Sequence, residues 1–372
     1  WLGFLLVLII AAGLRLWRID SLPPGFHFDE SFEGLEAWRI LTDPGYRPIF
    51  LTGNFGVPPA NAYANAFTFW LFERFGGEAG PTAMRTTAAV FGILGVAAVF
   101  ALADELRRFD RRRVTALLPL LAAAGLAVMR WHLHFSRMGI EPVIVPLLWA
   151  SVTWLFLRGW RTGSRLAFVA SGVLLAAAMY TYQAAWILPF LMIPLAFILW
   201  LDQRRTALAQ SAGELRRARL WGTVLTALTA FILFLPLGLF FLENQALVLM
   251  RPTQVAIVGE TGSPADAGVW PNVVATAKMF GPLGMPGDMD PRRNIPGAPA
   301  LNLWLALPFY FGLILALVRV GNPAYSIPLL GLVGLLVPGI FTEYAPHFHR
   351  ILGAAGPTAV LIGLGLNEIW RW

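Results

Sequence analysis

Apolar runs long enough to cross a lipid bilayer alternate with short polar connections along most of the chain. A transmembrane helix needs about 20 mostly apolar residues. On that criterion the chain predicts ten spans, near residues 1–17, 81–103, 114–130, 140–157, 166–184, 186–201, 220–242, 301–318, 325–341 and 351–369. A turn near Tyr182–Ala185 is needed because residues 166–201 are too long for one crossing. The pattern predicts one all-α, polytopic transmembrane bundle over residues 1–372.

The connection over residues 18–80 has its own pattern. Pro23, Pro24 and Gly25 end the first helix, because proline and glycine interrupt helices. Apolar side chains then recur at helical spacing, at Phe32, Leu35, Trp38 and Leu41. The acids Glu33 and Glu36 fall on another side of the same helix. This predicts an amphipathic helix that lies at the membrane interface. A second surface helix is predicted around Ala60–Phe75.

The composition agrees with a membrane protein and excludes several other classes. The chain is 57% hydrophobic and 13% charged, with 15 Trp and 27 Phe, whereas soluble domains are about 25% charged. The net charge of +7 does not indicate nucleic acid, because the arginines are dispersed among short connections. Cysteine is absent, which excludes disulfides, a thiol nucleophile and Cys-ligated zinc.

Arginine in the short connections predicts the orientation. Residues 104–113 hold five arginines, residues 158–165 three and residues 202–219 five, all on one side of the predicted bundle. By the positive-inside rule this side is cytoplasmic. The long connections 18–80 and 243–300 are then extracytoplasmic. We expect an integral protein of a prokaryotic plasma membrane, with a retained first span; because the chain begins at Trp1, we expect a fragment of a longer protein.

Polar residues that could act in chemistry gather in the extracytoplasmic segments. A charge in the membrane centre costs about 2–3 kcal/mol, so such residues tend to face a protein cavity or the interface. They form four groups: Asp29 and Glu30; Arg130, His132, His134, Arg137 and Glu141; Tyr180, Tyr182 and Gln183; and Glu343, His347, His349 and Arg350. Simpler roles are also open: Asp29 as a helix N-cap, and Arg137 and Arg350 as interfacial anchors.

The histidine spacing does not favour a metal site. His132 and His134 are two residues apart, which on a helix directs them to different faces. His347 and His349 could share a ligand only in extended backbone, with Asp29, Glu30 or Glu343 as a third ligand. A divalent metal is possible, but histidines that form hydrogen bonds are the favoured interpretation.

Several motifs of the chain together resemble those of a known family. An Asp-Glu pair in the first outer loop, Asp29-Glu30, is similar to the signature of GT-C superfamily membrane glycosyltransferases. The branch it resembles is that of dolichyl-phosphate-mannose protein mannosyltransferases and aminoarabinose transferases, glycosyltransferase family 39 type. Three further motifs resemble this branch: Phe135-Ser136-Arg137-Met138-Gly139, Met179-Tyr180-Thr181-Tyr182 and Ala345-Pro346-His347-Phe348-His349-Arg350. Relatives often carry large soluble modules or further spans, which this chain lacks.

The resemblance implies transfer of a sugar from a polyprenyl-phosphate donor to a hydroxyl of a glycan, lipid or protein acceptor, within membrane lipid and on the extracytoplasmic face. A carboxylate can serve as general base for the hydroxyl, and arginine binds phosphate oxygens bidentately. The implied roles are Asp29 as base and Glu30 as its orienting or acceptor-binding partner. The phosphate would be bound by Arg137 and Arg350, with His347 and His349 as secondary donors. The implied cavity or acceptor residues are Tyr180, Tyr182, Glu141 and Glu343.

Two alternatives are a transporter or lipid-linked sugar flippase, and an inactive membrane scaffold. The predicted spans hold few charges near their centres, and no internal repeat is evident. Both observations argue against a transporter built from repeated halves. A scaffold would tolerate the loss of Asp29, so that substitution separates it from an enzyme.

Overall fold

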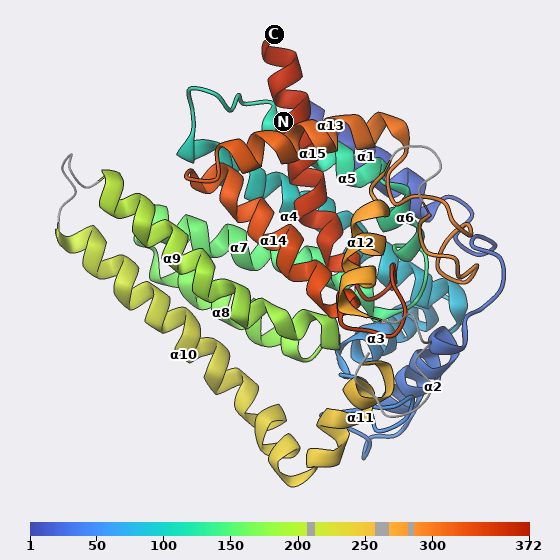
Figure 1. The fold of residues 1–372 in the computed structure, drawn as a ribbon. Helices are drawn as coiled ribbons and strands as arrows, with labels where there is room; N and C mark the ends of the chain where they lie inside the picture. Colours follow the sequence, from blue (N-terminus) through green and yellow to red (C-terminus); the bar gives the residue numbers. More distant parts are fainter. Residues whose placement is uncertain (207–212, 257–267, 282–285) are drawn as a thin grey trace.

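The computed structural model describes residues 1–206, 213–256, 268–281 and 286–372 (Figure 1). The described residues form helices joined by turns, and contain no β-strand beyond two isolated bridges. The α-helices are α1 Leu2–Leu16, α2 Phe28–Thr42, α3 Ala60–Arg74, α4 Pro81–Leu106, α5 Leu118–Val128, α6 Arg130–Phe135, α7 Ile144–Thr162, α8 Arg165–Met179, α9 Leu188–Thr206, α10 Gly213–Glu243, α11 Gln245–Val255, α12 Val269–Lys278, α13 Leu303–Val318, α14 Pro323–Ile340 and α15 Ala355–Arg371. The predicted all-α fold is confirmed.

Apolar helices occupy the positions of all ten predicted spans. Among the described residues, six helical segments are long and apolar enough to cross a bilayer: 81–109, 141–162, 183–205, 213–243, 323–340 and 352–371. The other four predicted spans coincide with the shorter apolar helices α1, α5, α8 and α13. The predicted turn between α8 and α9 is present, as a turn at residues 180–181 and extended backbone at Tyr182, followed by the 3₁₀ helix Gln183–Ile187.

A buried arginine explains why α5 is short. The backbone at Met129 is extended and separates α5 from α6, so the last carbonyls of α5 lack helical partners. The guanidinium of Arg15, on α1, donates to the carbonyl oxygens of Leu126 (3.4 Å) and Ala127 (3.1 Å) and lies 2.9 Å from His132 Nδ1. Arg15 therefore stabilises the helix break and ties α1 to it.

Close helix contact near the C-terminus depends on glycine. A methyl group on Gly312 of α13 would overlap the carbonyl of Leu361, and one on Gly365 of α15 would overlap the carbonyl of Pro308. Small residues at such crossings let helix backbones approach each other, as is typical of membrane proteins. This contact holds α15 in the centre of the bundle.

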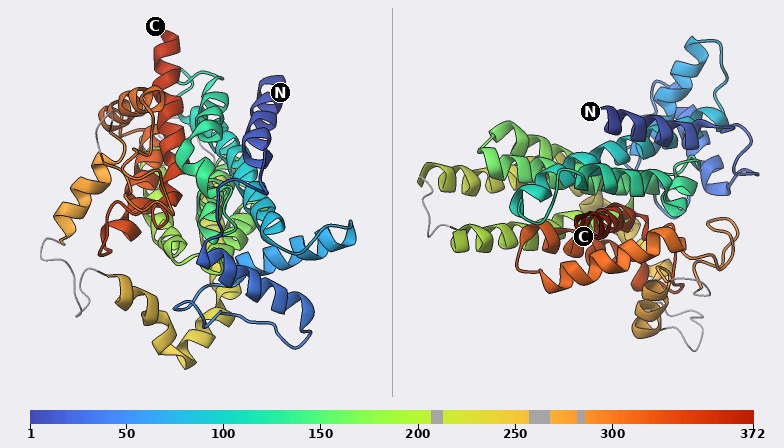
Figure 2. Two further views of the ribbon diagram at one scale, coloured as in Figure 1. Left: turned by 90° about the vertical axis from the view of Figure 1, so that its right-hand side faces the viewer. Right: turned by 90° about the horizontal axis from the view of Figure 1, so that it is seen from above.

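The two predicted surface helices are present as α2 and α3. They pack together through a small apolar cluster that includes Ala37, Ile40, Ala62 and Ala66. They lie at the end of the molecule away from both chain termini (Figure 2). The predicted second long loop, residues 243–300, contains α11 and α12; its residues 257–267 and 282–285 lie outside the described residues.

Candidate functional site

The segments that carry the predicted site residues meet at one end of the bundle, near α2, α3 and α11 (Figure 1). Hydrogen bonds join them directly. The Gly139 N–H donates to Glu30 (2.8 Å), the Trp131 indole donates to the Phe348 carbonyl (3.1 Å), and the Gln183 amide donates to the Gly56 carbonyl (2.7 Å). The chain segments that carry the four polar groups are therefore joined in one region of the molecule.

The start of α2 has a different cap from the one considered for Asp29. His27 is the N-cap: its Nδ1 accepts the N–H of Asp29 at 3.1 Å, and its own N–H donates to Glu30 at 3.0 Å. This reciprocal pair is a capping box, in which a side chain three residues into the helix bonds back to the cap. Asp29 is therefore not the cap, and its carboxylate is left for other contacts.

Glu30 is a fully engaged, buried carboxylate. Its side chain is 1% exposed and lies 3.3 Å from Arg85 Nε, while its two oxygens also accept the N–H groups of Gly139 and His27. Arg85 in turn donates to the carbonyls of Pro23 and Gly25. Glu30 and Arg85 are thus a buried pair that holds α2, α4 and the 136–140 turn together.

Asp29 retains some contact with solvent. Its side chain is 13% exposed and accepts one hydrogen bond, from the Asn54 amide at 2.9 Å. The His27 ring lies 3.4 Å from the other carboxylate oxygen. Among the described residues, the second oxygen of Asp29 thus accepts no hydrogen bond.

Tyr182 marks the point where acids and arginines come together. Burial raises the pKa of its hydroxyl, and Glu141 and Asp29 raise it further, while Arg350 and Arg251 oppose the rise. Charges act measurably on one hydroxyl only from nearby. The predicted residues Asp29, Glu141 and Arg350 thus lie within electrostatic range of Tyr182, together with Arg251 of α11.

Tyr180 lies elsewhere. Its hydroxyl donates to the Leu233 carbonyl (3.0 Å) and accepts the Leu237 N–H (3.3 Å), both on α10. These two groups would normally bond to each other within the helix, and Pro236 lies between them. A side chain inserted into the helical hydrogen-bond ladder is a recognised companion of a kink. The structure therefore places Tyr180 against α10, whereas the sequence analysis had predicted that it lines a cavity.

The segment 342–350 supplies the cationic side of the site. The His349 ring is stacked between Phe135, at 5.8 Å, and Tyr182, at 5.4 Å. Burial, followed by nearby arginines, lowers the pKa of His347 and of His349 well below 6.5, so both rings are neutral at pH 7. Burial lowers the pKa of Arg350 to about 10, which leaves it charged, and its Nη1 is buried with no hydrogen-bond partner among the described residues.

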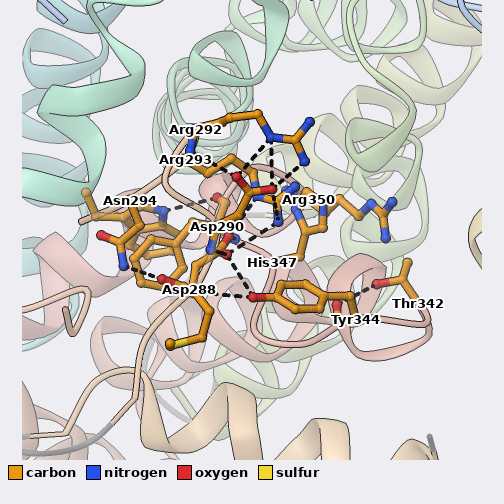
Figure 3. A network of polar contacts seen from close by, with 12 residues as sticks. Asp288, Asp290, Arg292, Arg293, Asn294, Thr342, Tyr344, His347 and Arg350 are labelled. Carbon is orange, nitrogen blue, oxygen red and sulfur yellow. Dashed lines mark hydrogen bonds and ion pairs between the residues drawn. The ribbon is translucent and has the colours of Figure 1, made fainter. Parts of the chain in front are cut away.

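The loop before α13 forms a network of acids and arginines beside this segment (Figure 3). Arg292 donates to both oxygens of Asp290 (2.6 to 3.1 Å), which contributes most to holding the pKa of Asp290 at about 2. Arg293 binds Asp288 at 3.0 Å and Asp290 at 3.1 Å. The charges of Arg292 and Arg293 are therefore compensated within the loop.

Two hollows flank this loop. One, of about 740 Å³, is lined by residues that include His27, Glu30, Arg130, His134 and Arg292. The other, of about 410 Å³, is lined by Met289, Asp290, Arg292, Arg293, Glu343, Tyr344, His347 and Arg350. Arg292 lines both, so the two hollows are neighbours. Three residues predicted from the sequence, Glu343, His347 and Arg350, line this second hollow together.

Arg137 is placed apart from these hollows. Its guanidinium donates to the carbonyls of Leu14 (2.5 Å) and Trp17 (2.6 Å) and, more weakly, to those of Arg18 and Leu22 (3.3 Å each). The carbonyls at the end of α1 lack helical partners. Arg137 satisfies them and fixes the start of the first outer loop.

Several residues of the site escaped the sequence interpretation. Arg85, Arg251, Arg292 and Arg293 contact or face predicted site residues, and Glu33 is a buried acid whose pKa is raised well above 4.5 by burial and then by Glu141. Arg85 near the start of an apolar helix was a visible signal, since a charge there needs a partner. The loop residues carried no periodic pattern. Among the described residues, no group of three or more potential ligands has the geometry of a metal site.

The fold is similar to that of solved membrane enzymes. It matches the apo oligosaccharyltransferase of Archaeoglobus fulgidus with a TM-score of 0.61 and 15% identity, over 99% of this chain and 50% of that one. The same enzyme tethered to an acceptor peptide with the NVT sequon gives 0.57 and 13%, over 99% and 49%. ArnT from Cupriavidus metallidurans bound to undecaprenyl phosphate gives 0.59 and 16%, over 98% and 59%.

These solved structures are glycosyltransferases with the GT-C fold, so the fold expected from the sequence is confirmed. This chain spans about half the length of the oligosaccharyltransferase and somewhat more of ArnT. No protein-family model and no curated protein matches the sequence.

Proposed function

We propose that this chain is a membrane glycosyltransferase that moves a sugar from a polyprenyl-phosphate donor to an acceptor hydroxyl, with Asp29 as general base and Arg350 as the ligand of the departing phosphate. The observation that carries the proposal is that Nη1 of Arg350 has no hydrogen-bond partner among the described residues and that the Asp29 carboxylate accepts only one hydrogen bond among them, with both groups in electrostatic range of the Tyr182 hydroxyl. If Arg350 were fully paired and both oxygens of Asp29 accepted hydrogen bonds from the protein, neither group could serve the reaction.

The transfer step follows from these two groups. Asp29 takes the proton of the acceptor hydroxyl as its oxygen attacks the anomeric carbon of the donor sugar. The bond from that carbon to the phosphate oxygen breaks, and its electron pair leaves with the phosphate. Arg350 stabilises the charge that grows there, because its Nη1 has no other described partner. A neutral His349 can donate one hydrogen bond without competing as an acid.

The remaining predicted residues receive supporting roles. Glu30 holds the base in place through Arg85 and the 136–140 turn. Glu141 and Tyr182 lie beside the reacting groups. We assign the hollow of about 410 Å³ to the donor phosphate and the larger one of about 740 Å³, lined by Glu30 and His27, to the acceptor. Two neighbouring hollows suit a reaction between two substrates. ArnT, with a similar fold, was solved with undecaprenyl phosphate, which supports a lipid-linked donor here.

The proposed orientation places the site on the extracytoplasmic face. A cysteine at Pro44, in the exposed part of the 18–80 segment, should react with an impermeant maleimide added to intact cells, and one at Arg112 only after permeabilisation. The opposite labelling pattern would overturn the orientation.

The function itself is tested with purified protein in lipid nanodiscs. A panel of undecaprenyl-phosphate sugars is offered with glycan, lipid and peptide acceptors, and release of undecaprenyl phosphate is measured. Release that depends on an acceptor and disappears in Asp29→Asn supports the proposal. Sugar-lipid movement across a vesicle membrane without transfer would identify a flippase instead.

A further inference from the structure

We infer that Asp288 is a positioning residue for the donor phosphate: its carboxylate sets the turn that presents Arg350 and withholds Arg293 from the phosphate. The inference rests on the proposed function, because it takes Arg350 as the phosphate ligand. Asp288 belongs to the loop before α13, whereas its partners extend into the segment 344–348 before α15 (Figure 3).

The carboxylate of Asp288 is fully buried and saturated with donors. One oxygen accepts the Phe348 N–H at 2.9 Å and Arg293 Nε at 3.0 Å. The other accepts the Tyr344 hydroxyl at 3.2 Å and the Asp290 N–H at 3.0 Å. A buried charge is tolerated only with such partners, so this position is specific for an anionic side chain with two acceptor oxygens.

These contacts fix the position of the backbone just before Arg350. Phe348 lies two residues before Arg350, and both of its backbone polar groups are held: Asp288 accepts its N–H, and the Trp131 indole donates to its carbonyl at 3.1 Å. The turn is therefore fixed to α6 on one side and to the 286–300 loop on the other. A side chain that starts from a fixed backbone loses less conformational freedom when it binds a ligand.

Asp288 also determines which arginine of this hollow remains available to the donor phosphate. It shares Arg293 with Asp290, and Asp290 holds Arg292. All three arginines line the hollow of about 410 Å³, but Nη1 of Arg350 lacks a partner among the described residues. The phosphate would thus meet a guanidinium with one unused donor nitrogen in a defined place, with the two other arginines restrained beside it.

A double-mutant cycle tests whether Asp288 acts through Arg350. The dissociation constant of undecaprenyl phosphate is measured for the parent, Asp288→Asn, Arg350→Ala and the double variant in nanodiscs. We expect Asp288→Asn to weaken binding about tenfold, as the loss of hydrogen bonds to a charged group predicts. In the Arg350→Ala background the same change should have little further effect, because interacting residues are not additive. Turnover at saturating donor should change less than affinity.

Two further variants control the experiment. Asp20→Asn makes the same chemical change at an exposed site and should bind like the parent. Tyr344→Phe removes one hydrogen bond to the Asp288 carboxylate and the acceptor of the Met289 N–H. It should weaken binding severalfold and lower the melting temperature less than Asp288→Asn does, because the Asp288 carboxylate keeps its other donors. It carries the test if Asp288→Asn does not fold, and parental affinity in it would then overturn the inference.

The outcomes separate the inference from the function it rests on. Parental affinity in Asp288→Asn, or equal losses with and without Arg350, would reduce Asp288 to a loop anchor. Parental affinity in Arg350→Ala would overturn the phosphate assignment in the proposed function. A parent protein that does not bind undecaprenyl phosphate would remove both.

Discussion

Two turns of this molecule look alike in sequence and differ in what their arginines do. Arg137 and Arg350 each follow a histidine-containing stretch and each precede a short 3₁₀ helix that leads into an apolar helix. Arg137 donates to four backbone carbonyls, whereas Nη1 of Arg350 is buried with no described partner. The difference shows that a charge near a membrane surface indicates a site only when its hydrogen-bonding capacity is unused.

The largest effect is expected from Asp29, the acid that shares the neighbourhood of Tyr182 with Arg350. Asp29→Asn should reduce transfer by about 10²–10⁴, the usual contribution of a general base, while donor binding persists. Transfer and undecaprenyl phosphate binding are measured side by side. Near-parental transfer would leave Asp29 with a structural role and overturn its assignment as the general base.

Arg350 comes next. Arg350→Ala should weaken donor binding roughly ten- to a hundredfold, because charge-assisted hydrogen bonds contribute about 1.5–3 kcal/mol each. Arg350→Lys should recover only part of this affinity, since an ammonium lacks the planar fork. Binding equal to the parent in both variants would make Arg350 an interfacial anchor and erase its contrast with Arg137.

Arg137 should show the opposite profile. Arg137→Ala leaves the carbonyls at the end of α1 without donors, so we expect a loss of about 1–3 kcal/mol of stability, read as a lower melting temperature in detergent. The folded fraction should bind undecaprenyl phosphate like the parent. A stable variant that fails to bind would place Arg137 in the donor site and contradict the comparison.

The last prediction concerns the pH dependence of stability. The folded-state pKa values of His347 and His349 lie well below 6.5, so the unfolded chain binds more protons in that range. Stability is then fully present above about pH 6.5 and falls as the pH drops below it, by at most about 1.4 kcal/mol per pH unit for each histidine. Melting temperatures between pH 7.5 and 5 check this. A double His347→Gln, His349→Gln variant should flatten the dependence; an unchanged slope would assign it to other groups.

The sequence by itself determined the fold class and the segments that matter. Hydrophobic periodicity is a local property, since a bilayer imposes length and composition on each span independently. The ten apolar helices and the surface helices α2 and α3 therefore lie where the pattern predicts them. Asp29, Glu141, Tyr182 and Arg350 could be selected for the same reason: each is a polar residue in an outer connection of a largely apolar chain.

Only the tertiary structure decided how these residues are used. Whether a donor or acceptor is free depends on partners far away in the chain, such as Arg85 for Glu30, the end of α1 for Arg137 and α10 for Tyr180. Hydrophobic spacing carries no record of such pairs. The same is true of Asp288, which lies in a loop without periodicity and has its meaning only through Tyr344 and Phe348, nearly 60 residues later. A hydrogen bond is short and directional, so it is defined by the packed bundle and not by the order of residues.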